Sequence, residues 1–180
     1  MTFTIGTNQM LKVLQVISWL LFIGLCIEAG SFIFNGFFTL LLNSKNASYF
    51  DLTGLYAFDR GYFIVMLLVM AIAGVLKALM FYLIVKILQD KKLNMCQPFN
   101  TAMGRFIFRV SYLAMGIGLF CWAGANYAAW FVKQGVKMPD IQYLRIGGAD
   151  VWLFMGVTLF VIAHIFKKGI EIQSENELTV

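Results

Sequence analysis

The sequence is poor in charged residues, histidine and proline. Only 13% of its 180 residues are charged, against about 25% in a soluble domain, and it has one histidine and two prolines. The apolar share is 61%, against about 45–50% in a soluble domain. A chain of this length cannot bury so much apolar surface, because much of any small domain's surface meets water. The composition therefore argues against a soluble enzyme and a disordered chain, and it predicts an integral membrane protein.

The sequence also lacks the residue clusters that common catalytic and metal sites need. Its one histidine, His164, cannot give a haem two imidazole ligands, and no carboxylate cluster accompanies it for zinc. The three cysteines form no CxxC pair, which argues against the four-helix membrane enzymes that make disulfides. No glycine-rich phosphate loop or nucleophile motif occurs either. We therefore expect no enzyme activity, no cofactor and no metal.

Four long apolar runs dominate the chain. They cover roughly residues 13–42, 61–88, 106–132 and 149–166. A membrane core about 30 Å thick needs about 20 mostly apolar residues per helix. Unbroken runs suit helices rather than the alternating strands of a membrane barrel. We predict an all-α, polytopic membrane protein with one domain, residues 1–180, forming a four-transmembrane-helix bundle that contacts the lipid bilayer and ends in a tail at 167–180.

The Lys and Arg residues near the span ends predict the orientation. With both termini in the cytoplasm, the inner set is Lys12, Lys86, Lys91, Lys92, Arg105, Arg109, Lys167 and Lys168. The outer set is then Lys45, Arg60, Lys133, Lys137 and Arg145. The larger set belongs on the cytoplasmic side, so we predict that both termini are cytoplasmic. These cations are scattered over helix ends and do not form a basic recognition helix of the kind that binds DNA. We therefore expect no direct contact with nucleic acid.

Two charged residues lie inside the apolar runs. Glu28 follows Lys12 by 16 residues, about 24 Å along a helix. Lys77 precedes Lys91 by 14 residues, about 21 Å, so the two charges fall at a similar depth in antiparallel spans. We predict an ion pair that either only pins the helices together or forms a polar site for a ligand or proton. Asn126, in the third run, is expected to hydrogen-bond across helices.

Small residues and aromatic residues are also patterned. Gly74 and Ala78 recur at a four-residue spacing, as do Ala114 and Gly118, which predicts close contacts between helices. Seven of the eleven Tyr and Trp residues lie in or beside the outer loops. This pattern fits an aromatic belt at the membrane boundary or a ligand-sensing face, and it predicts packed outer loops with short interfacial helices.

The tail carries the most specific sequence pattern, FKKGIEIQSENELTV. It resembles the ending of a bacterial family of four-span membrane proteins known as domain of unknown function 2975, which closes on acidic-Asn-acidic-Leu-Thr-Val/Ile. The matching positions are Gly169, Ile172, Gln173, Glu175, Asn176, Glu177, Leu178, Thr179 and Val180. Glu177 stands where the family usually has Asp. Pro98 and Phe99 are similar to the family's Pro-Phe before the third span. The resemblance implies a bacterial inner-membrane location.

The family has no established activity, but its genes often neighbour a small helix-turn-helix regulator. The resemblance therefore implies a non-enzymatic membrane regulator or sensor that binds a cytoplasmic transcription regulator. The docking residues would be Pro98, Phe99, Gln173, Glu175, Asn176, Glu177, Leu178 and Thr179. The tail could equally fold back onto the inner loop. The alternative function is a small transporter or proton-coupled exporter that uses Glu28, and no pattern in the sequence fixes the oligomeric state.

Overall fold

The computed structural model describes residues 7–41, 48–89 and 100–177. The helices are α1 (Thr7–Leu41), α2 (Thr53–Phe58), α3 (Arg60–Gln89), α4 (Thr101–Lys133) and α5 (Ala149–Glu177). Four of them, all except the short α2, are long and apolar enough to cross a membrane. No strand occurs in the described ranges. The predicted all-α fold with four membrane-spanning helices is confirmed.

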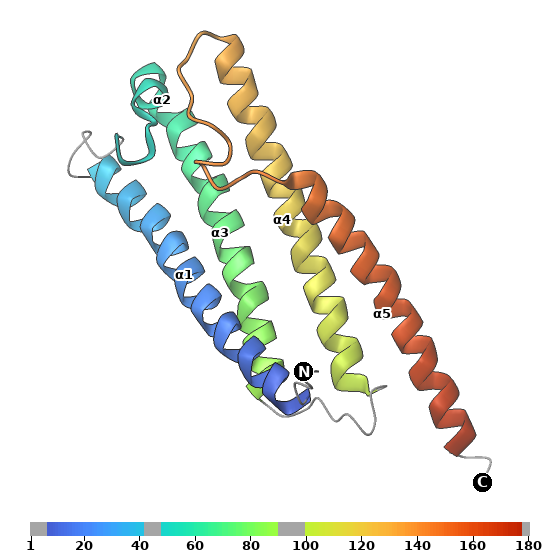
Figure 1. Ribbon diagram of the computed structural model, residues 1–180. Helices are drawn as coiled ribbons and strands as arrows, with labels where there is room; N and C mark the ends of the chain where they lie inside the picture. The colour runs from blue at the N-terminus through green and yellow to red at the C-terminus, as the bar shows by residue number, and fades with distance from the viewer. Residues whose placement is uncertain (1–6, 42–47, 90–99, 178–180) are drawn as a thin grey trace, which may run out of the picture.

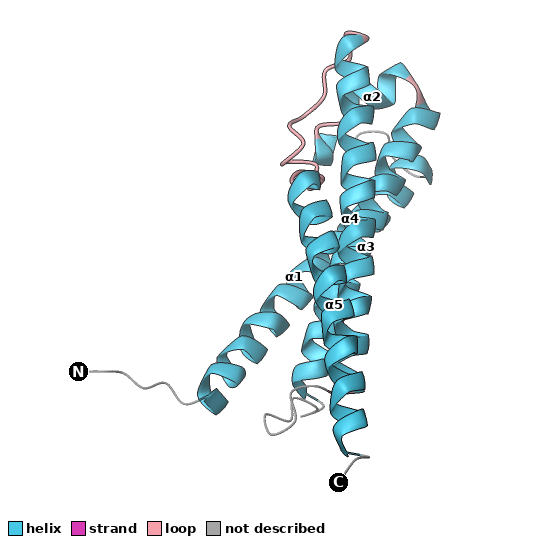
Figure 2. Cartoon of the chain, turned by 90° about the vertical axis from the view of Figure 1, so that its right-hand side faces the viewer, coloured by secondary structure: helices cyan, strands magenta, loops and turns pink. Residues whose placement is uncertain are grey.

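The four long helices lie side by side in a row (Figure 1). α1 packs against α3, α3 against α4, and α4 against α5, so α1 and α5 occupy the two ends of the row. Successive helices are antiparallel, and Thr7 and Glu177 therefore lie at the same end, here called the terminal end. The opposite end, here called the loop end, carries α2 and the loop 134–148. Figure 2 shows that the terminal half of α1 diverges from the other helices.

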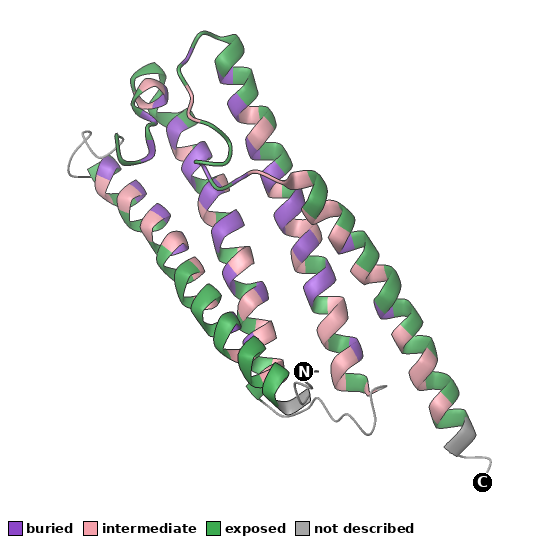
Figure 3. Ribbon diagram, viewed as in Figure 1, coloured by how far each residue is buried: buried purple, intermediate pink, exposed green. Residues whose placement is uncertain are grey.

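The core follows the two central helices. Buried residues recur on α3 every three or four positions, as at Phe63, Met66, Met70 and Ala73, which is the spacing of one helical face. In the most apolar 18-residue stretch of α3, 44% of the residues are buried, whereas in the corresponding stretch of α1 only 6% are buried. Figure 3 shows the same contrast, with buried residues gathered on α3 and α4 and exposed residues covering α1 and α5. Most of the apolar surface of α1 and α5 is therefore available to lipid.

The helices extend beyond the apolar runs predicted from the sequence. α1 has 35 residues and α3 has 30, about 52 Å and 45 Å in length, and both exceed the membrane core of about 30 Å. α4 begins before its run because the Asn100 side chain accepts a 2.8 Å hydrogen bond from the Met103 amide and caps the helix. α5 continues past residue 166, where Lys167 and Glu171 form an i,i+4 pair at 4.0 Å.

The loop end is packed around aromatic rings, as the sequence predicts. Phe131 of α4 is fully buried and contacts the rings of Phe58, Tyr62, Tyr127 and Trp130 at centroid distances of 4.8–6.0 Å. α2 is the predicted short helix in this region. These contacts hold α2 and the loop ends of α3 and α4 together as one unit.

Small residues let neighbouring helices approach closely within one chain. A Cβ added at Gly74 of α3 would lie 3.3 Å from the Cβ of Ala29 in α1. At Gly118 of α4, it would lie 2.6 Å from Cγ of Leu153 in α5, and at Gly156 of α5, 2.8 Å from the amide nitrogen of Met115. The predicted close helix contacts at Gly74 and Gly118 are confirmed.

Candidate functional site

The loop 134–148 forms one wall of the candidate site. It leaves α4 at the loop end and runs back along the row before α5 begins (Figure 1). Leu144 and Ile146 are fully buried and anchor the loop on the helices. Gly124 of α4 provides the room, because a Cβ there would lie 3.0 Å from Cδ1 of Ile146. Asp140 tightens the turn by accepting a 2.7 Å hydrogen bond from the Gln142 amide.

Arg145 lies between these two anchors and links the loop to α1 and α3. Its carbonyl oxygen accepts a 2.6 Å hydrogen bond from Nζ of Lys77 in α3. Its Nε lies 3.7 Å from Oε2 of Glu28 in α1. Arg145 has a φ of 59°, in the left-handed region, which costs about 1–3 kcal/mol for a residue other than glycine. The buried anchors on both sides hold the residue in this conformation.

The structure brings the two predicted intramembrane charges together through Arg145. Next to Glu28 in α1, Ala29 packs on Gly74 of α3, which lies three residues before Lys77. The direct Glu28–Lys77 ion pair stays a prediction, since the contacts here are from Glu28 to the Arg145 guanidinium and from Lys77 to its carbonyl. The Arg145 side chain is 64% exposed and that of Glu28 is 25% exposed. Such a pair contributes at most about 1 kcal/mol to stability, so it adds only a small term to the anchoring of the loop by the buried Leu144 and Ile146.

An open groove of about 890 Å³ surrounds this polar link. It is lined by Gly24, Ile27, Glu28, Ser31, Phe32, Tyr49, Phe50, Asp140, Gln142, Tyr143 and Arg145. The Tyr143 hydroxyl donates a 3.2 Å hydrogen bond to the carbonyl of Tyr49 and joins the two loops at the rim. The lining combines charged groups, an amide and two phenols with the apolar side of α1. This chemistry suits an amphipathic ligand with a charged head.

The remaining predicted residues lie elsewhere. Asn126 is exposed, and its side-chain amide donates a 2.9 Å hydrogen bond to the Trp122 carbonyl one turn back in α4. Gln173 and Glu175 lie on α5 near the terminal end, far from the groove along the helix. The backbones of Asn176 and Glu177 belong to α5, whereas their side chains, with Pro98, Phe99, Leu178 and Thr179, lie outside the described residues.

Sequence reasoning missed the loop's contribution to the site. Arg145 appeared only as an outer loop charge, although it contacts both predicted intramembrane residues. A signal was present in the stretch Tyr143–Gly147, where the apolar Leu144 and Ile146 flank the charge. Alternation of this kind indicates a segment whose side chains point alternately into the protein and out of it.

The fold and the groove define a multi-pass, all-helical membrane protein with a polar cluster between its first span and its last loop. A family model described as "Protein of unknown function (DUF2975)" matches residues 47–180. The chain therefore belongs to this family. No curated protein and no solved structure matches the chain. Lys77 and Arg145 lie inside the matched region, and Glu28 lies before it.

Proposed function

We propose that this protein is a non-enzymatic membrane regulator that senses an amphipathic ligand in the groove and signals to a partner at the terminal end. The observation that carries this proposal is the continuity of α5. The helix begins at Ala149, four residues after Arg145, and runs unbroken to Glu177. Its 29 residues measure about 44 Å, longer than a membrane core. A ligand that displaces the Arg145 loop therefore displaces one end of a rod whose other end carries the tail.

The Lys and Arg distribution supports one orientation of this rod in the membrane. We propose that the terminal end faces the cytoplasm of a bacterium and that the groove faces the outer side of its inner membrane. The support is the larger set of Lys and Arg residues at the terminal end, together with the common location of Thr7 and Glu177 there. The tail would then reach a cytoplasmic partner, such as the helix-turn-helix regulator that the family resemblance implies.

Deleting residues 174–180 tests the partner part of the proposal. We expect a helix-turn-helix protein to co-purify with the full chain from its native host in mild detergent and to be lost on deletion. The thermal unfolding temperature of the chain should stay within about 2 °C, because surface changes rarely exceed about 0.5 kcal/mol. Replacing 174–180 by an equally long Gly/Ser segment controls for length. A deletion that keeps the regulator bound but destabilises the helices would contradict docking and favour a tail folded onto the inner loop.

The partial exposure of Glu28 in the groove favours one second candidate, a small transporter. A carboxylate at membrane depth can exchange a proton with a substrate. Substrate or proton flux in liposomes that disappears in Glu28→Gln, but persists in Arg60→Gln at the loop end, would favour transport over signalling.

A further inference from the structure

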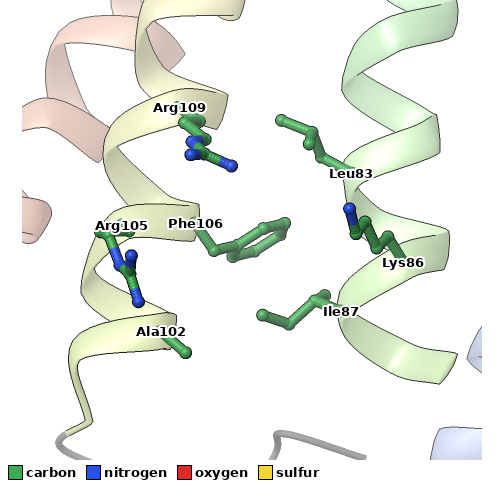
Figure 4. A pocket seen from close by; sticks show the side chains of 7 residues that line it. All are labelled: Leu83, Lys86, Ile87, Ala102, Arg105, Phe106 and Arg109. Atoms are coloured by element: carbon green, nitrogen blue, oxygen red, sulfur yellow. The ribbon is translucent and has the colours of Figure 1, made fainter. Parts of the chain in front are cut away.

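A second pocket lies between α3 and α4 near the terminal end, away from the groove. It measures about 190 Å³ and is lined by Leu83, Lys86, Ile87, Ala102, Arg105, Phe106 and Arg109. Figure 4 shows the amine of Lys86 and the guanidinium of Arg109 pointing toward each other across the gap, with the Phe106 ring beside them. Arg105 lies on the same helix as Arg109, and its Nε donates a 3.3 Å hydrogen bond to the Thr101 carbonyl.

The charge of this pocket has one sign. Three cations line it, and the described lining contains no acidic residue. Cations that face one another repel, and an anion placed between them converts that repulsion into attraction. A phosphate group suits the site, because guanidinium groups bind phosphate oxygens through paired N–H donors and a lysine adds a point charge.

An apolar groove continues from the cationic pocket along the same helix seam. It measures about 370 Å³, is lined by Leu79, Tyr82, Leu83, Arg109, Tyr112 and Leu113, and shares Leu83 and Arg109 with the pocket. Lys86 Nζ lies 5.9 Å from the ring centre of Tyr82, which places a pocket cation directly beside the apolar groove. Leu79, Tyr82 and Tyr112 are exposed, so the groove opens sideways, toward the position of lipid in a membrane.

We propose that the α3–α4 seam binds an anionic phospholipid of the cytoplasmic leaflet. Lys86, Arg105 and Arg109 hold its phosphate, and one acyl chain lies in the groove beside Tyr82 and Leu113. Basic pockets between membrane helices bind anionic headgroups in this manner. The adjoining apolar groove favours a lipid over free phosphate, which has no chain to place there. This site is independent of the ligand groove at the loop end.

The test is lipid binding to the purified full chain in detergent, followed by native mass spectrometry with added phosphatidylglycerol, phosphatidylcholine or inorganic phosphate. We expect phosphatidylglycerol to bind in preference to phosphatidylcholine, and inorganic phosphate to compete only weakly. Each cation removed should weaken phosphatidylglycerol binding about fivefold, so Lys86→Gln with Arg109→Gln should weaken it about 25-fold.

The matched control is Lys167→Gln with Lys168→Gln, which removes two charges near the terminal end of α5, outside the pocket. It should leave phosphatidylglycerol binding within about twofold of the original chain. Equal losses in the two double variants would overturn the proposal, because they would indicate attraction to net charge rather than a site. Inorganic phosphate that competes as well as the lipid would also overturn it.

Discussion

Replacing Gly118 or Gly156 by alanine is expected to lower the free energy of unfolding by about 1–3 kcal/mol each. The new Cβ would lie 2.9 Å from the Leu153 amide nitrogen at position 118, and 2.8 Å from the Met115 amide nitrogen at position 156. Backbone cannot move aside as a side chain can, so α4 and α5 must separate. In lipid, helix association depends on this close packing, and the better helix propensity of alanine, about 1 kcal/mol, does not compensate. Reversible unfolding in mixed micelles measures the loss.

The control for this prediction is Gly30→Ala in α1. Gly30 is also helical, but nothing lies within 4 Å of the position its Cβ would take. Alanine there should leave stability unchanged or raise it by up to about 1 kcal/mol. A loss at Gly30 as large as the losses at Gly118 and Gly156 would contradict the packing described for the α4–α5 seam.

Ile146→Ala is expected to lower the free energy of unfolding by about 2–5 kcal/mol and to release the loop that carries Arg145. Ile146 is fully buried, so truncation leaves a cavity beside Gly124 and loosens the left-handed turn at Arg145. Trypsin cleavage after Arg145 should accelerate under native conditions, because the loop then opens more often.

Ile141→Ala is the matched control within the same loop. Ile141 is 38% exposed, so the change should alter stability by about 0.5 kcal/mol or less and should leave the cleavage rate unchanged. If Ile141→Ala and Ile146→Ala accelerated cleavage equally, the loop would not be anchored through Ile146.

Most of the fold could be predicted from apolar runs alone. Three runs fall within α3, α4 and α5, and the first falls within α1 except for residue 42, which lies outside the described residues. The match is this close because about 20 consecutive apolar residues have few other stable structures in a membrane. The helix ends that differ most from the runs, Thr7, Thr101 and Glu177, are polar, and hydropathy does not distinguish a polar helix end from a loop. The cap at Asn100 sets the start of α4, and the i,i+4 pair of Lys167 and Glu171 supports the extension of α5.

The candidate site could be predicted only in part. The depth of Glu28 and Lys77 follows from a fixed rise per residue, so their similar level could be calculated. Their link through Arg145 depends on how far the loop runs back along the helices, and no periodic pattern encodes that distance. It is set by the burial of Leu144 and Ile146 and by a left-handed turn at a residue type that rarely adopts one.

The central claim is that the Glu28–Arg145 ion pair couples α1 to the start of α5, although these helices lie at opposite ends of the row and α5 packs on α4. The most direct measurement is the spin-label distance between Phe34→Cys and Val151→Cys, two exposed positions, in a chain whose native cysteines are replaced by alanine. We expect one narrow distance distribution in that chain. Glu28→Gln and Arg145→Gln should each broaden it, and the double variant should broaden it no further. Arg60→Gln, which removes a charge at the loop end outside the groove, should leave it narrow. An unchanged distribution in Glu28→Gln, or equal broadening in Arg60→Gln, would contradict the claim.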